Sequence, residues 1–276
     1  MKSPKIESVN PVWRQRYTIV PTPQLESVIA RTWTYENGFR EVWHAHEEAQ
    51  LIYVTRGVLR ILTPAGIWTL PPFHAMWLPA ATTHELHAIG DVVVRTAYVA
   101  PDADANMQGR SRCQVLHIGE LLDALVNGLT PGSQEVGDAR RAELLTELFL
   151  LELARAPEVT SGTLPLPDDR RLRSICEQLL SYPENNDTIE RWGERVGASP
   201  STLGRLFRDE TGLSFGQWRQ QLRLVEAVAR LALGVPVTVI AEELGYQSAS
   251  AFIAMFRKTL GTTPQRYLNS RTEAVS

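Results

Sequence analysis

The sequence predicts an α+β multidomain protein with an N-terminal β-barrel, a helical middle segment and a C-terminal all-α domain. Three patterns predict it. Strand-like segments fill residues 1–115, leucines at helical spacing fill 116–156, and only helical patterns follow residue 170. The chain has 276 residues, 43% apolar and 21% charged, and is therefore long and apolar enough for two packed domains.

The expected barrel covers residues 1–115. Its strand-like segments are rich in Val, Ile, Thr, Tyr and Trp and are separated by Gly or Pro; they are 50–62, 66–72, 75–80 and 92–100. Strands that follow one another so closely, with no helix between them, favour a barrel or a sandwich.

Amphipathic helices are expected over residues 116–156. Four leucines share one helical face: Leu144, Leu145, Leu148 and Leu151. This face fits either packing within the domain or a contact between two copies of the chain, and the second reading predicts a homodimer. Residues 157–169, rich in Pro and Thr, are expected to form a linker and hinge.

The overall charge excludes some classes of protein. With 28 basic and 31 acidic residues the net charge is −3, so the chain is not a globally basic nucleic-acid coat. A basic surplus is confined to residues 195–271, which hold 10 basic and 5 acidic residues. The two cysteines indicate neither a disulfide framework nor a thiolate zinc site. Because no segment reads as a signal peptide or membrane span, we expect a soluble, cytoplasmic protein with no membrane partner.

The C-terminal half contains an internal repeat. Residues 191–218 align with 239–267, and from Ser199 and Ser248 onward the matched residues keep a constant offset of 49. Each copy has a small residue four positions before a glycine, followed by a serine that can cap a second helix. This is the pattern of a helix-turn-helix. Such helix pairs also pack ordinary α-domains, but two tandem copies with a local basic surplus favour double-stranded DNA as a partner.

Residues 187–268 resemble the tandem helix-turn-helix module of the AraC/XylS transcription regulators, most specifically over 202–224 and 242–268. The resemblance implies a DNA-binding domain over 170–270 whose two recognition helices enter successive major grooves, joined by a long helix over 213–234. It implies base contacts from Ser201, Thr202 and Arg205 in the first copy and from Ala249, Ser250 and Ala254 in the second. It also implies phosphate contacts from Arg208, Arg257 and Lys258. Arg205 is the best candidate for reading guanine, and the small residues of the second helix predict weaker specificity there.

The barrel segment carries a histidine pattern. His44, His46 and Gln50 have the same parity, so on one strand they would project to one face, and His84 follows a turn further on. The pattern resembles the two motifs of the cupin barrel, although Ala81 stands where the second motif has glycine. Three imidazoles and an amide oxygen suit a divalent transition metal such as zinc, nickel, iron or manganese. The alternative is a pocket in which the same residues line the site of an organic effector.

Together these features predict a transcription regulator, not an enzyme. A small molecule or metal in the cupin-like barrel would bias the placement of the DNA-binding module on its operator. RNA polymerase is a further candidate partner, and regulators of this layout often control neighbouring efflux or catabolic genes. Two alternatives stay open: a cupin metalloenzyme (dioxygenase or isomerase) tethered to DNA, and a constitutive DNA-binding protein with a purely structural barrel. The effector, the operator and the sign of regulation do not follow from the sequence.

Overall fold

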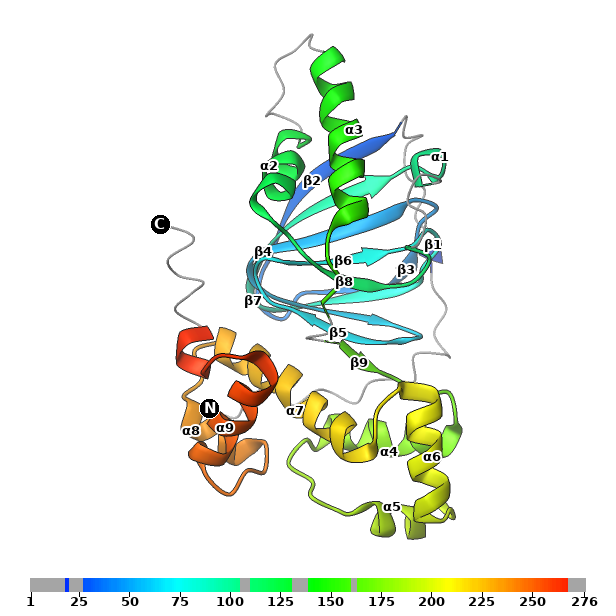
Figure 1. The fold of residues 1–276 in the computed structure, drawn as a ribbon, viewed down its shortest axis with the longest axis vertical. Helices are drawn as coiled ribbons and strands as arrows, with labels where there is room; N and C mark the ends of the chain where they lie inside the picture. The colour runs from blue at the N-terminus through cyan, green and yellow to red at the C-terminus, as the bar shows by residue number, and fades with distance from the viewer. Residues whose placement is uncertain (1–17, 20–26, 105–109, 131–138, 160–162, 268–276) are drawn as a thin grey trace. The chain divides into compact units, whose positions relative to one another are not determined.

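The computed structural model describes residues 18–19, 27–104, 110–130, 139–159 and 163–267 (Figure 1). The chain divides into two compact units. Of the described residues, the barrel unit comprises 18–19, 27–63, 69–104, 110–130 and 139–159, and the helical unit comprises 64–68 and 163–267. This architecture, strands first and helices afterwards, confirms the predicted fold class.

The strands form a nine-stranded, mostly antiparallel sheet. They are β1 (Thr18–Ile19), β2 (Val28–Tyr35), β3 (Arg40–Ala45), β4 (Ala49–Thr63), β5 (Gly66–Leu70), β6 (His74–Leu78), β7 (His84–Val99), β8 (Gln114–His117) and β9 (Thr163–Pro165). The longest strands, β4 and β7, pair with each other, and β7 also pairs with β2 and β3. The end of β3 therefore lies beside the start of β7, where His44 is opposite His84, and the start of β4 lies beside the end of β7, where Gln50 is opposite Tyr98.

A bulge bends the pairing of β4 with β7 around Gly57. Gly57 has a φ of +76°, and a Cβ built on it would lie 2.4 Å from the carbonyl oxygen of Asp91. Only glycine fits this position without a shift of the backbone, because the neighbouring atom belongs to the main chain.

Two helices cover one face of the barrel sheet: α2 (Glu120–Gly128) and α3 (Ala139–Arg155). Phe149 and Leu153 of α3 are fully buried in a core that includes Leu51 and Trp77 of the sheet, and Leu145 packs against it. The other three leucines of the predicted face, Leu144, Leu148 and Leu151, stay exposed. One side of α3 therefore packs within the unit, as the first interpretation held, while a second side is left uncovered.

The expected hinge over 157–169 is instead partly hydrogen-bonded. The amide of Val159 donates to the carbonyl of Val115 (2.8 Å), and residues 163–165 form β9, which pairs with residues 66–68. Leu164, in the middle of β9, is buried. Because this segment contains an apolar side chain, Leu164, it can pack against the rest of the protein, which a freely moving hinge would not do. Residues 160–162 lie outside the described part of the chain.

The helical unit contains α4 (Arg170–Ser181), α5 (Ile189–Val196), α6 (Pro200–Thr211), α7 (Phe215–Ala232), α8 (Val237–Glu243) and α9 (Ala249–Leu260). The short helix α1 (Pro101–Asp104) belongs to the barrel unit. The predicted connecting helix is α7, which begins at a capping box formed by Ser214 and Gln217. In the described residues no helix has the length and apolar character needed to cross a membrane.

Candidate functional site

The first helix-turn-helix is α5 and α6, joined by a turn at Gly197. Gly197 has a φ of +68°, and a Cβ on Gly193 would lie 2.5 Å from the carbonyl oxygen of Ala198. The Ser199 hydroxyl accepts from the amide of Thr202 (3.2 Å), and Pro200 occupies the first turn of α6. The predicted roles of the small residue, the turn glycine and the serine cap are confirmed.

The exposed face of α6 carries Ser201, Arg205 and Arg208. Arg205 Nη1 lies 3.0 Å from Asp209 Oδ2, and its side chain is 67% exposed. An exposed pair of this kind contributes little, so Arg205 can exchange Asp209 for a base edge at small cost. Thr202 differs from its neighbours: it is half-buried and its hydroxyl lies 2.9 Å from Ser199 Oγ. It is positioned to stabilise the helix start as well as to face outward.

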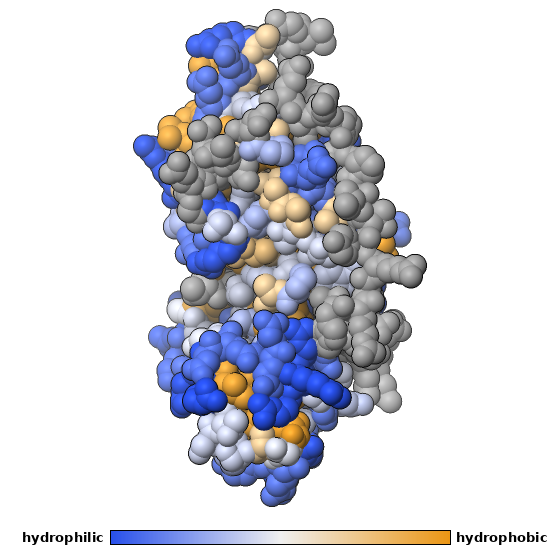
Figure 2. All heavy atoms as spheres, turned by 90° about the vertical axis from the view of Figure 1, so that its right-hand side faces the viewer, coloured by the Kyte–Doolittle hydropathy of each residue, from blue (hydrophilic) through white to orange (hydrophobic). Residues whose placement is uncertain are grey.

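The second helix-turn-helix is α8 and α9. Gly245 provides the left-handed turn with a φ of +74°, and the Ser248 hydroxyl accepts from the amide of Ala251 (3.2 Å). Of the residues expected to face outward, four are exposed: Ser250, Ala254, Arg257 and Lys258. Ala249 is half-buried and packs against the core around Phe252 and Phe256. On the face shown in Figure 2, hydrophilic side chains cover most of the helical unit.

A buried arginine of α7, not anticipated from the sequence, ties the two copies together. Arg223 is 8% exposed and donates to the carbonyl of Pro183 (3.0 Å) and to Asn186 Oδ1 (2.9 Å), just before the first copy. Its guanidinium also lies 5.4 Å from the ring centroid of Tyr246, beside the turn of the second copy. Asn186 in turn donates to the carbonyl of Gly245 (3.2 Å). In the sequence Arg223 looks like any charged residue of an amphipathic helix, because its partners are distant backbone carbonyls.

In the barrel unit, the predicted histidines converge. The ligand-capable atoms of His44, His46 and His84 all lie within 4.8 Å of one another, and all three side chains are buried. The expectation that His44, His46 and Gln50 share one strand is wrong. The strand β3 ends at Ala45 and β4 begins at Ala49, so His46 lies in the turn between them. The residues meet because the chain turns back on itself here.

Hydrogen bonds fix which imidazole nitrogens are free. The Nδ1 atoms of His44, His46 and His84 lie 2.9, 2.8 and 2.8 Å from the carbonyl oxygens of Val42, Glu48 and Thr82, respectively. A carbonyl oxygen only accepts, so each Nδ1 carries the proton and each Nε2 presents a lone pair. His84 Nε2 is buried with no hydrogen-bond partner in the described structure. Burial, followed by its two histidine neighbours, lowers the pKa of His84 to about 3, so the ring is neutral.

Gln50 adds a fourth lone pair. Thr96 Oγ1 donates to the carbonyl of Leu51 (3.1 Å) and therefore accepts from Gln50 Nε2 (2.9 Å). The amide oxygen of Gln50 is thereby turned toward His46 Nε2, at 3.0 Å. With the proton on Nδ1, the lone pair of His46 Nε2 and the Gln50 oxygen face the same small space, where one metal ion could contact both. The donor set of three imidazole nitrogens and one amide oxygen fits zinc, nickel, iron or manganese.

Ala81 explains why the second motif normally has glycine. Its φ is +58°, in the left-handed region, and its amide donates to the carbonyl of His46 (2.9 Å). The turn that delivers His84 thus also holds the backbone of His46 in place. Alanine reaches the same geometry as glycine here, at a steric cost of about 1 kcal/mol.

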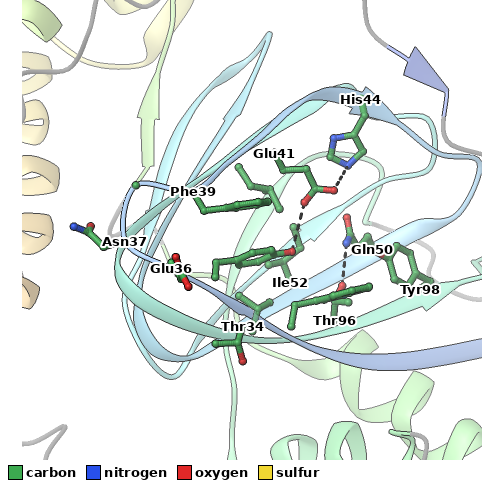
Figure 3. A pocket seen from close by; sticks show the side chains of 15 residues that line it. Thr34, Glu36, Asn37, Phe39, Glu41, His44, Gln50, Ile52, Thr96 and Tyr98 are labelled. Atoms are coloured by element: carbon green, nitrogen blue, oxygen red, sulfur yellow. Dashed lines mark hydrogen bonds and ion pairs between the residues drawn. The ribbon is translucent and has the colours of Figure 1, made fainter.

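A cavity of about 710 Å³ adjoins the histidines, and His44 and Gln50 belong to its lining (Figure 3). Its other lining residues come from β2, the β2–β3 turn, β3, β4 and β7: Trp33, Thr34, Tyr35, Glu36, Asn37, Gly38, Phe39, Glu41, Ile52, Leu86, Val94, Thr96 and Tyr98. The Tyr35 hydroxyl donates to Glu41 Oε2 (3.4 Å), and Glu41 Oε1 lies 3.7 Å from His44 Nε2. Glu41 and the aromatic walls were not anticipated from the sequence, because their meeting depends on the pairing of β2 and β3 with β7.

Comparison with known proteins agrees with both halves of the molecule. The AraC-like ligand binding domain matches residues 27–154, and a helix-turn-helix domain matches residues 192–270. The Escherichia coli HTH-type transcriptional regulator NimR is 32% identical over 82% of this chain and 81% of its own length. The arabinose operon regulatory protein of Escherichia coli is 27% identical, covering 72% of this chain and 64% of that protein.

Among solved structures, ToxT from Vibrio cholerae aligns over 88% of this chain and 98% of its own, with 10% identity and a TM-score of 0.37. The identity to NimR over most of both chains, together with the two matched domains, shows the family. The chain belongs to the AraC family of DNA-binding transcriptional regulators and carries an AraC-like ligand binding domain.

Proposed function

We propose that this regulator responds to an effector held at the histidine site, and that the effector is a divalent metal or a small molecule bound beside it. The observation that carries the proposal is the convergence of three imidazole lone pairs and the Gln50 oxygen on one buried point. An effector shifts the DNA-binding state only through its different affinity for the two states of the protein. A cation at the site would replace the direct contact between His46 Nε2 and the Gln50 oxygen (3.0 Å), so this contact is the part of the site that we expect to change on filling.

His44, His46, His84 and Gln50 would hold the metal, through their Nε2 atoms and the amide oxygen. When bound, the metal would supply an electrophilic anchor for a donor atom of an effector. The backbone carbonyls that hold each Nδ1–H keep the rings oriented before anything binds.

Elemental analysis of full-length protein purified without chelator tests the metal. We expect about one equivalent, lost in a His44→Ala, His46→Ala double variant and retained in His117→Ala, which removes an exposed histidine outside the cluster. Unchanged metal content in the double variant would refute the site. No metal in any of the three proteins would leave an organic effector as the only form of the proposal.

On DNA, we propose that α6 and α9 read successive major grooves. Arg205, with Ser201 and Thr202, would contact base edges, and Ala249, Ser250 and Ala254 would make the corresponding, weaker contacts of the second copy. Arg208, Arg257 and Lys258 are exposed cations that would bind phosphates. Selection of bound sequences from a random DNA pool tests this, since a protein that reads two grooves should return two half-sites about one helical turn apart.

We propose a homodimer formed through α3. Leu144, Leu148 and Leu151 are 47, 38 and 48% exposed and recur at four- and three-residue spacing, as in a coiled-coil seam. Sedimentation of the full-length protein should give a dimer, converted to a monomer by Leu148→Glu. The control is Leu233→Glu, which places the same charge on another exposed leucine. A monomeric wild-type protein would contradict the proposal.

The remaining expectations follow from this role. A chromosomal operator places the protein in the cytoplasm, with RNA polymerase as a candidate partner and neighbouring efflux or catabolic genes as candidate targets. We propose no catalytic activity, because the relatives are regulators. Oxygen consumption by the iron-loaded protein, with candidate substrates, would contradict that and favour a tethered cupin enzyme.

A further inference from the structure

The walls of the cavity beside the histidines are aromatic and flat. The rings of Tyr35 and Phe39 stack with their centroids 4.6 Å apart and an angle of 12° between their planes. Trp33 and Phe39 also line the cavity, and each is 41% exposed although both are large and apolar. Exposed aromatic faces that line a hollow favour a planar, apolar ligand body, which removes their surface from water.

The charge of the lining is negative. Glu36 and Glu41 line the cavity, and its described lining contains no lysine or arginine. The two tyrosines add no positive charge and stay protonated: burial, and then the Glu41 carboxylate, raises the pKa of Tyr98 to about 12 and that of Tyr35 further. With no metal at the histidine site, the formal charges on the described lining residues are those of Glu36 and Glu41, so a cationic ligand would gain from a carboxylate and from the ring faces, and an anionic ligand would gain from neither.

Glu41 is placed to select the polar group of such a ligand. Its carboxylate accepts from the Tyr35 hydroxyl (3.4 Å) and lies 3.7 Å from His44 Nε2, and Figure 3 shows it pointing toward His44. One carboxylate oxygen accepts from the Tyr35 hydroxyl, and the side chain is 40% exposed, so lone pairs remain for a donor that enters the cavity.

We propose that this cavity binds a planar aromatic cation that carries N–H donors, with its ring against Trp33, Tyr35 and Phe39 and its nitrogen beside Glu41. That this ligand acts as the effector rests on the proposed function; that the cavity binds it does not. The class of ligand is aromatic, positively charged and donating, such as an amidine or a protonated amine on a fused ring.

Three probes of matched shape test the ligand class: 2-naphthamidine as the cation, 2-naphthamide as the neutral form and 2-naphthoate as the anion. Isothermal titration calorimetry with the full-length protein, as purified, should show the amidine binding about tenfold more tightly than the other two. Glu41→Gln should remove this preference and change the affinity for naphthamide by no more than about twofold. The control is Glu120→Gln, which removes an exposed carboxylate on α2 and should leave all three affinities unchanged. Phe39→Ala should weaken all three probes by a similar factor and preserve their order.

The inference is overturned if naphthoate binds as tightly as naphthamidine, if the preference survives in Glu41→Gln, or if none of the probes binds. The proposed function fails separately. If naphthamidine binds tightly but does not change the affinity of the protein for the selected DNA, the ligand class is supported and the role of such a ligand as the effector is refuted.

Discussion

The two helix-turn-helix copies share their internal residues and differ on their exposed faces. Ser199 and Ser248 cap the second helix of each copy, and Phe207 and Phe256 are fully buried at matched positions. On the exposed faces, Arg205 of α6 corresponds to Ala254 of α9, and Asp209 corresponds to Lys258. The residues that build the fold are retained in both copies, whereas the exposed residues that we propose contact DNA differ between them.

The exposed residues of α6 and α9 differ in a way that indicates different contributions to DNA binding. In α6 a long donor, Arg205, lies at the centre of the exposed face, with an acidic Asp209 one turn later. In α9 the centre is alanine and the last turn carries Arg257 and Lys258. Arg208 of α6 corresponds to Arg257 of α9, so Lys258, which corresponds to Asp209, is the basic residue that the last turn of α6 lacks. We propose that the first copy contributes more to base reading through Arg205 and that the second contributes more to phosphate binding through Lys258.

The largest effect is expected from removing Arg223, whose contacts join the two helix-turn-helix copies. Arg223→Met leaves the carbonyl of Pro183 and Asn186 Oδ1 without their buried donor, and should lower the free energy of unfolding by about 2–3 kcal/mol. Because the two copies are then positioned independently, the affinity for DNA with two half-sites should fall toward the affinity for DNA with a single half-site. Urea unfolding and fluorescence anisotropy measure the two effects.

Arg191→Met is the matched control for Arg223→Met. It removes an exposed arginine of the same unit, and Asp187 keeps Arg195 as a partner. We expect a change within about 0.5 kcal/mol. Equal effects from the two substitutions would show that Arg223 does not hold the copies together.

Arg205→Ala tests the specificity of the first copy. It should cost about 2 kcal/mol of DNA binding and relax the preference at one base position. Arg208→Ala should weaken binding to all sequences alike, because a phosphate contact carries no sequence information. Repeating the selection of bound DNA with each variant distinguishes them, and an unchanged sequence preference in Arg205→Ala would contradict the assignment.

Substitution of the two serine N-caps tests whether both helix-turn-helix copies depend equally on their caps. Ser199→Ala and Ser248→Ala each remove the side-chain acceptor of one amide at the start of a recognition helix, and each should cost about 1 kcal/mol of stability. Urea unfolding of the two variants should give similar losses. A loss confined to one variant would mean that the copies do not rely on the same cap.

The two copies also show what a sequence can and cannot predict. Their glycine turns and serine caps are local features, decided by residues within a few positions, and the structure has them where they were expected. The contacts of Arg223 are not local, since its carbonyl partners lie about 40 residues earlier in the chain. The same holds for β9, whose three residues acquire a strand conformation only by pairing with residues 66–68.

The histidine site was predicted in its members but not in its geometry. The spacing of His44, His46 and Gln50 identified the residues, yet parity on one strand was the wrong reason, because the chain turns at residues 46–48. The left-handed conformation of Ala81 and the cavity that Glu41 helps to line depend on how the strands meet. Residue types can be recognised from the sequence, whereas the lone-pair directions that argue for a cation require coordinates.

The smallest expected effect concerns charge at the last turns of the recognition helices. Lys258→Ala should weaken DNA binding by less than about 1 kcal/mol, equally for all sequences, and should reduce the dependence of the logarithm of affinity on the logarithm of salt concentration by about one. Asp209→Ala, at the matched position of α6, should do the opposite and strengthen binding, because it removes an exposed negative charge near the phosphates and frees Arg205. Binding measured across a salt series tests both variants. If the two variants shift affinity in the same direction, the second helix is not the phosphate-binding partner of the first, and the division between the copies fails.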